Sequence, residues 1–472
     1  MSIKRKILVD VSYGMSFRNI VLNKTFWSKL TQEYEVHLIT PLQIGSEDQK
    51  DLKISRVIDS SKWPRNFLIK ILISINVRTL HIKRLMDLSD FFLKQHLGWP
   101  LVSRYHETYR NKDNLNQALY FWPAIKRTYV GKILKKIVGC FPIFHPADKI
   151  FKDNDYLFLI NTHNSEYNSV LIAQVSQKNK VPIIGFPMGL DNIMHGPFLF
   201  EPDLLFFWGP DQDLEYSTVQ VTWNKNLRNS RIEMLGNLIF DTLDQTKDRE
   251  AFDENEEIID TPFLLFTTMP EDDHPGQEQI CKTIVDYLRT NHLPHKLVIR
   301  LRPGHDELMW QNFKLQNVDE VILQIPSGIS FDKSGAKNKI DLNKEIRDMS
   351  NYSSTIYQSE AVISRALSTT YTDSLFIGTP AITTQYYPED GNRSKGFHEM
   401  WRQICTFYPH YQKGYKFVFN AEELIDFLKG IIETKNELLI NEDQINFLNR
   451  QFYVGEESAG DRAFEIIKEN FS

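Results

Sequence analysis

Short apolar runs alternate with amphipathic segments along the first half of this chain, and this alternation most limits the folds open to it. The apolar runs occupy residues 6–12, 34–40, 155–162, 181–189 and 203–209. Amphipathic segments such as IVLNKTFWSKLTQ and EYNSVLIAQVSQKNK separate them. Continuous apolar runs predict strands that are buried on both faces, as in parallel sheets whose connections are helices. We therefore expect a doubly wound α/β domain here.

The same alternation starts again in the second half, with runs at 262–268, 296–303, 320–326, 360–366 and 380–387. A chain of 472 residues exceeds what a single core usually supports. We therefore expect two Rossmann-like domains, residues 1–245 and 255–445, facing each other across a cleft. The acidic stretch 242–260 predicts a linker or exposed hinge between them. Residues 325–345 fit neither pattern and predict a loop.

Composition and cysteine spacing bear on the partners and the compartment of the protein. The formal net charge of −6 gives no global case for binding nucleic acid. Three cysteines lie far apart, so they predict neither a disulfide framework nor a metal site, and a reducing cytoplasm is the natural compartment. No signal-type segment and no apolar run of about 18 residues occurs, so we expect a soluble or peripheral protein.

Basic residues are concentrated between 61 and 152, where 17 Lys and Arg face 5 Asp and Glu. Aromatic and apolar residues are interleaved with them, as in VGKILKKIVGCF. Anionic lipid attracts such segments, so we interpret this basic block as an insert that docks on the inner face of the cell membrane. In the alternative, its apolar sides pack into the first domain and only the lysines are exposed. No nucleic-acid-binding motif is present, so we expect no nucleic acid partner.

The stretch SRALSTTYTDSLFIGTP, residues 364–380, carries the clearest chemistry. It predicts the end of a strand followed by a helix that ends at Gly378. Three hydroxyl residues fall at the start of that helix: Ser368, Thr369 and Thr370. Free backbone N–H groups and the positive end of the helix dipole meet them there, which favours a phosphate or diphosphate. Asp373 lies one turn further, within reach of sugar hydroxyls, and Arg365 can neutralise the diphosphate. The alternatives are that the hydroxyl residues only cap the helix and that Arg365 is a surface residue.

This stretch resembles the nucleotide-binding segment of GT-B glycosyltransferases of bacterial surface-polysaccharide biosynthesis, a group that includes enzymes using CDP-glycerol, Kdo and other nucleotide-activated donors. There, a strand is followed by paired small hydroxyl residues and by an acid five residues before Gly-x-Pro. Ser368 and Thr369 match the pair, Asp373 the acid, and Gly378 and Pro380 the end. The family usually has Glu at the acid position, where it binds the ribose of the nucleotide.

Three further pieces resemble the same group. The segment RIEMLGNLIFDTL, residues 231–243, is similar to its GN-x-x-x-D join between domains. Arg302-Pro303 stands where the group often has His-Pro, and His305 follows closely enough to replace that histidine. Residues 446–472 resemble the C-terminal helix that crosses back to the first domain, with Arg462 in its usual place.

The resemblance implies an α/β GT-B fold and a glycosyltransferase that passes a sugar from a nucleotide-activated donor to a cell-surface glycan or lipid-linked acceptor. Such enzymes need no cofactor and generally no metal ion. One alternative is a nucleotide-sugar 2-epimerase of the same fold. Another is an inactive glycan-binding or scaffold subunit, which is favoured slightly because Met188-Gly189 replaces the His-Gly of many relatives.

The acceptor hydroxyl needs a base if the transfer inverts the sugar, and carboxylate or histidine can serve. His195 lies in a Gly- and Pro-punctuated loop, while His163 and Asp10 each follow or end a predicted strand. All three are candidates, although turn or cap roles would explain Asp10 equally well. His274 lies beside several acids, but we expect it to lie in a solvated loop that binds no metal ion.

We predict that His195→Ala lowers turnover about 10²–10⁴-fold and leaves donor binding intact, because the base acts only on the acceptor proton. Steady-state kinetics with a parallel nucleotide-binding assay check this. A loss below about tenfold, with His163→Ala crippling the enzyme instead, would transfer the role to His163.

Overall fold

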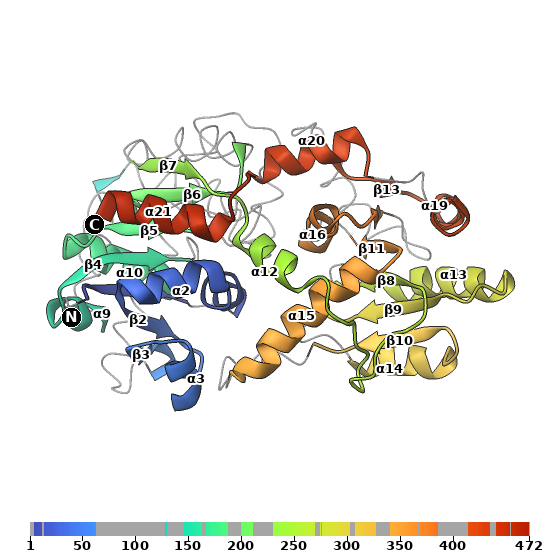
Figure 1. Ribbon diagram of the computed structural model, residues 1–472, viewed down its shortest axis with the longest axis horizontal. Coiled ribbons are helices and arrows are strands. Elements are labelled where there is room, and N and C mark those ends of the chain that lie inside the picture. Colours follow the sequence, from blue (N-terminus) through green and yellow to red (C-terminus); the bar gives the residue numbers. More distant parts are fainter. Residues whose placement is uncertain are drawn as a thin grey trace. The chain divides into compact units, whose positions relative to one another are not determined.

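The computed structural model in Figure 1 describes most of both expected sheets. The described residues are 4–11, 14–62, 128–129, 146–162, 167–186, 200–210, 230–269, 274, 276–302, 307–326, 340–365, 368–385, 414–434, 440–453 and 455–471. Most of the basic block lies outside them, and so do three predicted site residues: His163, His195 and His305. Those predictions stay predictions.

In the described part of the first half, strands form one parallel sheet of seven, in the order β3-β2-β1-β4-β5-β6-β7. Their bounds are Lys6–Asp10 (β1), Glu35–Thr40 (β2), Arg56–Asp59 (β3), Tyr156–Asn161 (β4), Ile183–Gly185 (β5), Leu204–Phe207 (β6) and Arg231–Met234 (β7). The chain runs outward from β1 to β3, then returns to place β4 on the other side of β1. This reversal is the switch point at which doubly wound sheets bind ligands.

The second sheet repeats that plan with six parallel strands among the described residues, ordered β10-β9-β8-β11-β12-β13. Their bounds are Phe263–Thr267 (β8), Lys296–Arg300 (β9), Val321–Gln324 (β10), Ala361–Arg365 (β11), Ala381–Thr384 (β12) and Phe417–Val418 (β13). Here the direction reverses between β8 and β11, which pair directly. The predicted phosphate-binding stretch follows β11, so it lies at the switch point.

The ten predicted strands are confirmed to within a few residues, because their apolar runs are long enough to be recognised. Three strands were missed: β3, β7 and β13. Strand β3 carries alternating partly exposed residues and β13 has two residues, so neither gives a continuous apolar run.

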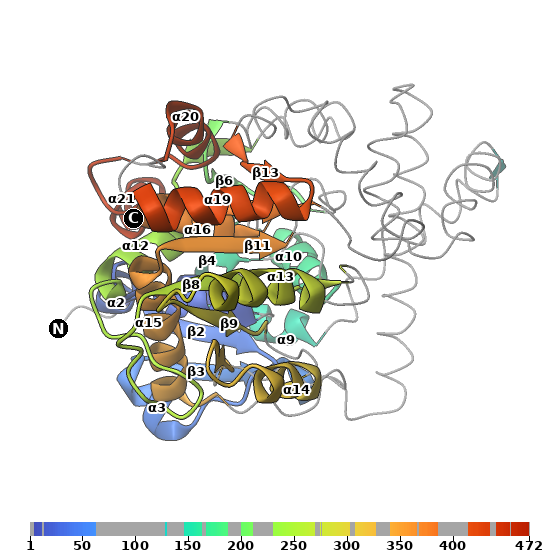
Figure 2. The ribbon, with the colours of Figure 1, turned by 90° about the vertical axis from the view of Figure 1, so that its right-hand side faces the viewer.

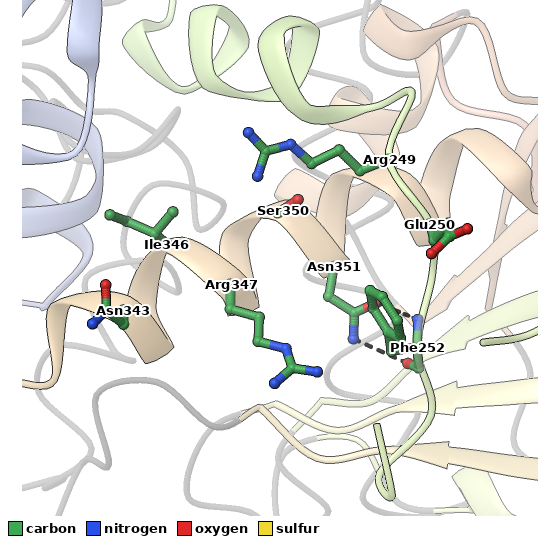
Figure 3. Close-up of a pocket in the computed structure, with 8 residues that line it drawn as sticks. All are labelled: Arg249, Glu250, Phe252, Asn343, Ile346, Arg347, Ser350 and Asn351. Atoms are coloured by element: carbon green, nitrogen blue, oxygen red, sulfur yellow. Dashed lines mark hydrogen bonds between the residues drawn. The ribbon is translucent and has the colours of Figure 1, made fainter. Parts of the chain in front are cut away.

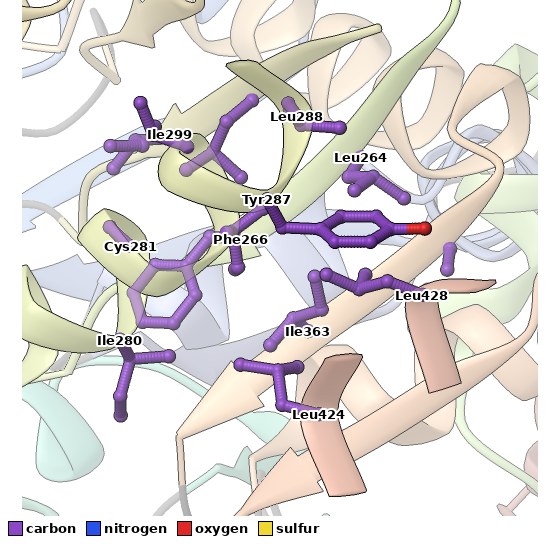
Figure 4. Packing of buried hydrophobic residues seen from close by; sticks show 14 of the residues in the cluster. Leu264, Phe266, Ile280, Cys281, Tyr287, Leu288, Ile299, Ile363, Leu424 and Leu428 are labelled. Carbon is purple, nitrogen blue, oxygen red and sulfur yellow. The ribbon is translucent and has the colours of Figure 1, made fainter. Parts of the chain in front are cut away.

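Helices cover both faces of the second sheet. An apolar cluster joins β8, β9 and β11 to α13 (Gln277–Thr290), α14 (Glu307–Gln316) and α19 (Ala421–Thr434), through buried residues such as Phe266, Ile280 and Leu428 (Figures 2 and 4). Strand side chains alternate between faces. The opposite face meets α15 (Leu342–Gln358) and α16 (Thr369–Ile377).

The remaining helices of the described residues are short or belong to the first sheet. They are α1 (Gly14–Ser16), the π-helical Phe17–Val21, α2 (Lys24–Glu33), α3 (Ser46–Asp51), the 3₁₀ turn Ser60–Lys62, α9 (Ala147–Lys152), α10 (Tyr167–Lys178), α12 (Leu238–Thr246), α20 (Glu442–Gln451) and α21 (Ala459–Phe471). None of the helices in the described ranges has the length and apolarity needed to cross a bilayer.

The chain divides into two compact units, one of residues 1–238 with 451–472 and one of residues 239–450. Helix α21 thus belongs to the first unit, where Figure 1 shows it beside α2. Lys29 of α2 pairs with Asp461 at 2.7 Å and lies over the Phe464 ring. Arg462 donates from Nη2 to the Leu235 carbonyl at 2.6 Å. The C-terminal segment is therefore held by apolar burial of α21 together with an arginine that binds backbone carbonyls.

The segment 242–260, predicted as a linker or exposed hinge, is exposed at many positions but is also packed into the second unit. Leu243 and Ala251 are completely buried, and hydrogen bonds join the segment to α15. The Ser353 hydroxyl donates to the Leu243 carbonyl at 2.7 Å, and the Asn351 amide exchanges two hydrogen bonds with the backbone of Phe252. The loop predicted for 325–345 is wrong from residue 342 on, because α15 begins there.

We predict that Gly236→Ala destabilises the first unit. Gly236 has φ +90°, and an added Cβ would lie 2.6 Å from the Tyr453 carbonyl oxygen and 3.0 Å from Arg462 Nη2. The left-handed backbone alone costs a non-glycine residue about 1–3 kcal/mol, and the collision adds to this.

Differential scanning calorimetry measures the effect. Gly378→Ala is the control, because Gly378 has φ +93° but an added Cβ would meet nothing within 4 Å. Equal losses of unfolding free energy in both variants would show that the close approach of residue 453 does not matter.

Candidate functional site

The turn from β11 to α16 forms the core of the candidate site. Ser368 is the N-cap residue of α16, as the sequence predicts, and Gly378 ends the helix in the left-handed conformation. Tyr371 N–H donates to the Ser368 carbonyl at 3.2 Å. The first N–H groups of a helix have no partner inside it, so those of Thr369 and Thr370 are directed at whatever lies before the helix.

The side chain at the N-cap of α16 does not cap the helix. The Ser368 side chain makes no capping hydrogen bond, and its Oγ is buried with no hydrogen-bond partner among the described residues. Thr369 is exposed and Thr370 is partly buried. A buried hydroxyl without a partner is unfavourable, so a ligand that bonds to it recovers that cost. This observation favours the binding interpretation over the capping alternative.

Asp373 lies one helical turn into α16 and is 4% exposed. Its Oδ2 accepts a 2.6 Å hydrogen bond from the phenol of Tyr352 on α15, and its Oδ1 is buried without a partner among the described residues. The same phenol lies 3.2 Å from the Thr370 hydroxyl. Asp373 therefore already has one partner in the protein, and its predicted contact with ribose stays a prediction.

Burial controls the charge of this acid. It raises the pKa of Asp373 from 3.8 to about 7, and the Tyr352 hydrogen bond opposes the rise. Burial and the neighbouring Asp373 charge also raise the pKa of Tyr352 well above its ordinary value, so the phenol stays protonated and can donate. Asp373 is thus poised to gain or lose a proton near neutral pH.

A buried ion pair lies against the Tyr352 ring. Arg300, the last residue of β9, donates to Asp348 Oδ1 at 2.8 Å and to Gln324 Oε1 at 3.2 Å. Its guanidinium carbon lies 5.2 Å from the centre of the Tyr352 ring. The paired charges are almost fully buried, so removing one would leave the other unpaired at a cost of several kcal/mol, about 3–5. The ends of β9 and α16 are therefore connected through α15. Arg300, Asp348 and Tyr352 were not predicted from the sequence.

The two other predicted arginines differ in exposure. Arg302 follows β9 and is exposed, with its N–H donating to Thr268 Oγ1 at 2.9 Å. Arg365 is 1% exposed, and its Nη1 donates to the Thr384 carbonyl at 3.3 Å, so the surface alternative for Arg365 is wrong. An exposed arginine at a strand end can reach a ligand, and the predicted contact of the buried Arg365 with a diphosphate stays a prediction.

In the first unit, Asp10 ends β1 and Asn161 ends β4, on the two sides of the switch point. Asp10 is fully buried, and Asn161 Nδ2 lies 3.4 Å from its Oδ2. His163, two residues after Asn161, lies outside the described residues, and so does His195. A catalytic role for Asp10 stays a prediction.

His274 is 5% exposed, so the prediction that its side chain lies in a solvated loop is wrong. Within the residues that the structure describes, no group of His, Cys, Asp and Glu is arranged to hold a metal ion.

A cavity of about 310 Å³ lies on another face of α15 (Figure 3). Its lining residues are Arg249, Glu250, Phe252, Asn343, Ile346, Arg347, Ser350 and Asn351. Arg347 pairs with Glu256 at 2.7 Å and lies over the Phe252 ring. Neither Tyr352 nor Asp373 lines it, so α15 uses one face for this cavity and another for the β9–α16 network.

We predict that Asp373→Asn stabilises the ligand-free protein, and more so at pH 8 than at pH 4. An acid with a raised folded pKa contributes stability that is present below its unfolded pKa of 3.8 and is lost as pH rises through about 7. Asparagine removes that loss and still accepts the Tyr352 hydrogen bond.

Thermal unfolding at the two pH values measures the difference. Asp426→Asn is the control, because the Asp426 side chain is 68% exposed. A stability gap that does not grow with pH would contradict the raised pKa.

The fold of this chain is similar to that of known proteins. No protein-family model matches the chain, and no curated protein matches it significantly. A Listeria monocytogenes structure described as a UDP-N-acetylglucosamine 2-epimerase has 10% identity and a TM-score of 0.53, covering 100% of this chain and 97% of that one. A Staphylococcus aureus structure of MnaA with UDP has 11% identity and a TM-score of 0.52, covering 99% and 96%. At such identities the likeness concerns fold. With two parallel, doubly wound sheets and whole-length likeness to these structures, the chain has the GT-B fold.

Proposed function

We propose that this chain is a glycosyltransferase that takes a nucleotide-activated sugar and passes the sugar to a cell-surface glycan acceptor. The second unit binds the nucleotide at the β11–α16 turn. The nucleotide sugar is a substrate, and the reaction uses no bound cofactor or metal ion. The acceptor is lipid-linked, and the basic block of residues 61–152 brings the enzyme to the anionic inner leaflet.

One observation carries the nucleotide site: Ser368 stands at the N-cap of α16 with a buried hydroxyl that caps nothing. The turn also lies at the switch point of its sheet, where α/β proteins bind ligands. Two backbone N–H groups, three hydroxyl residues and the helix dipole then favour an anion. A diphosphate fits this chemistry, because its oxygens accept from all of these donors.

Arg302 extends the anion site from the end of β9, which is separated from β11 by one strand. It is exposed and follows β9, while the hydroxyl turn follows β11, with β8 between them. A guanidinium can bind phosphate through two hydrogen bonds. An arginine at this place supplies charge and hydrogen-bond donors to a phosphate.

A nucleotide-sugar 2-epimerase is the second candidate. It is favoured by the whole-length likeness of the chain to a structure described as such an enzyme and to one that contains UDP. Both activities use the same nucleotide site, so the site alone does not separate them. They differ in whether the sugar leaves the nucleotide.

Incubation with UDP-, CMP-, CDP- and GDP-sugars separates the candidates. A transferase releases free nucleotide when acceptor glycolipid is present, whereas an epimerase gives an isomeric nucleotide sugar without acceptor. Binding with neither reaction would indicate a glycan-binding or scaffold subunit. If no nucleotide raises the melting temperature, the proposed donor site is wrong.

We predict that Thr369→Ala weakens nucleotide binding about 10- to 100-fold, because one hydrogen bond to a charged group contributes about 1.5–3 kcal/mol. Thr369 is exposed, so the unfolding temperature should change little. Titration calorimetry with UDP, or with the nucleotide that the panel selects, measures the affinity.

Thr290→Ala is the matched control, because Thr290 is an exposed threonine at the opposite, C-terminal end of a helix in the same unit. Affinity that is the same in both variants would remove Thr369 from the site.

A further inference from the structure

Tyr352 connects two of the residues proposed to bind the nucleotide, although it belongs to a different helix. Its phenolic oxygen lies 2.6 Å from Asp373 Oδ2 and 3.2 Å from Thr370 Oγ1. A phenol has one hydrogen to donate. The shorter contact goes to the carboxylate, which cannot donate when ionised. In that state the phenol hydrogen goes to Asp373 Oδ2, and Thr370 donates its own hydrogen to the phenolic oxygen.

This assignment fixes the direction of a short chain of hydrogen bonds, from Thr370 to Tyr352 to Asp373. The Thr370 hydroxyl is turned toward α15, and its lone pairs are then directed elsewhere. Asp373 is held by Oδ2, which leaves Oδ1 as the acceptor for a further donor. Oδ1 is buried and has no hydrogen-bond partner among the described residues.

Tyr352 is itself held rigidly. Its ring lies against the Arg300 guanidinium, and Arg300 is fixed by Asp348 and Gln324. Asp348 and Tyr352 are four residues apart on α15, so they share one helix face. The phenol is therefore aimed at α16 by a buried ion pair on β9 and α15.

We propose that Tyr352 is a positioning residue of the nucleotide site, holding the Asp373 carboxylate so that Oδ1 can accept from a hydroxyl of the bound nucleotide. This inference rests on the proposed function. It assigns to the site a residue that touches the acid and acts on the ligand through it.

Other charged groups near α16 have their own partners. The backbone elements closest to α16 are α15, β11 and β12, and side chains of α12, residues 414–416 and α20 also contact it. Of these, Lys416 lies at the Tyr371 phenol through its backbone N–H, and α12 contacts α16 through the Phe240 ring on Phe376. Helix α15 contributes Tyr352 and Asp348, and Asp348 is paired with Arg300. Strand β11 ends at Arg365, which donates to the Thr384 carbonyl, and β12 carries no titratable side chain. Tyr352 is thus the group among the described residues with a hydrogen bond to the Asp373 carboxylate.

A double-mutant cycle tests the proposal. UDP affinity is measured by titration calorimetry for the wild type, Tyr352→Phe, Asp373→Asn and the double variant. Tyr352→Phe should weaken binding about tenfold, because the Asp373 carboxylate loses the hydrogen bond that holds it in place and favours its ionised form. In the Asp373→Asn background the same change should have little further effect, because Tyr352 acts through the acid.

The pH profile adds a readout that mere loss of packing would not move. The Tyr352 hydrogen bond lowers the pKa of Asp373, so Tyr352→Phe should raise it. Binding requires the ionised acceptor, so affinity should begin to fall at a higher pH in the variant than in the wild type. Tyr357→Phe is the matched control, since Tyr357 lies on the same helix with 47% exposure.

Three outcomes would overturn the proposed role of Tyr352. If the wild type binds UDP and Tyr352→Phe binds equally well with the same pH midpoint, Tyr352 has no positioning role. Additive losses in the cycle would also overturn it, because Tyr352 would then act independently of Asp373. If the wild type binds neither UDP nor another nucleotide of the panel, the proposed function fails, and the role of Tyr352 at that site fails with it.

Discussion

The hydrogen bond between Tyr352 and Asp373 joins two helices that cover the same face of the second sheet, α15 and α16. Through it, the buried Arg300–Asp348 pair is linked to the helix that starts at the hydroxyl turn. The charges in this network are removed from water, so each needs its partner to stay in place. A buried acid with one unsatisfied oxygen costs stability in the empty protein, as expected at a site built to receive a donor.

Helix α15 can carry this network because hydrogen bonds fix it on several sides. Its hydroxyl and amide side chains bind backbone carbonyls of the segment 243–252, as Ser353 and Ser354 do with Leu243 and Glu250. These bonds satisfy groups that would otherwise be buried without partners. The acidic segment is therefore part of the second unit's packing, and it holds in place the helix that presents Tyr352.

The sequence predicts the strands well because buried parallel strands are continuous apolar runs, and it predicts α16 because Ser368 and Gly378 mark its ends. It fails at α15, whose face is rich in Ser, Thr and Asn. Such residues usually indicate turns, because their side chains compete for backbone hydrogen bonds. Here tertiary partners accept those bonds, and local pattern cannot show that. Tyr352 was missed for the same reason, since its partner Asp373 is 21 residues away. The N-cap Asp341, whose carboxylate accepts from Lys344 N–H, was the available signal for this helix.

A crystal structure of the protein with bound UDP, or with whichever nucleotide binds in the panel, tests the central claim most directly. We expect the diphosphate to lie at the N-terminus of α16, accepting from the Thr369 and Thr370 N–H groups and from the Ser368 hydroxyl. We expect a ribose hydroxyl to donate to Asp373 Oδ1 while Tyr352 keeps its bond to Oδ2. A nucleotide bound elsewhere, with the Ser368 hydroxyl and Asp373 Oδ1 still without partners, would contradict the account.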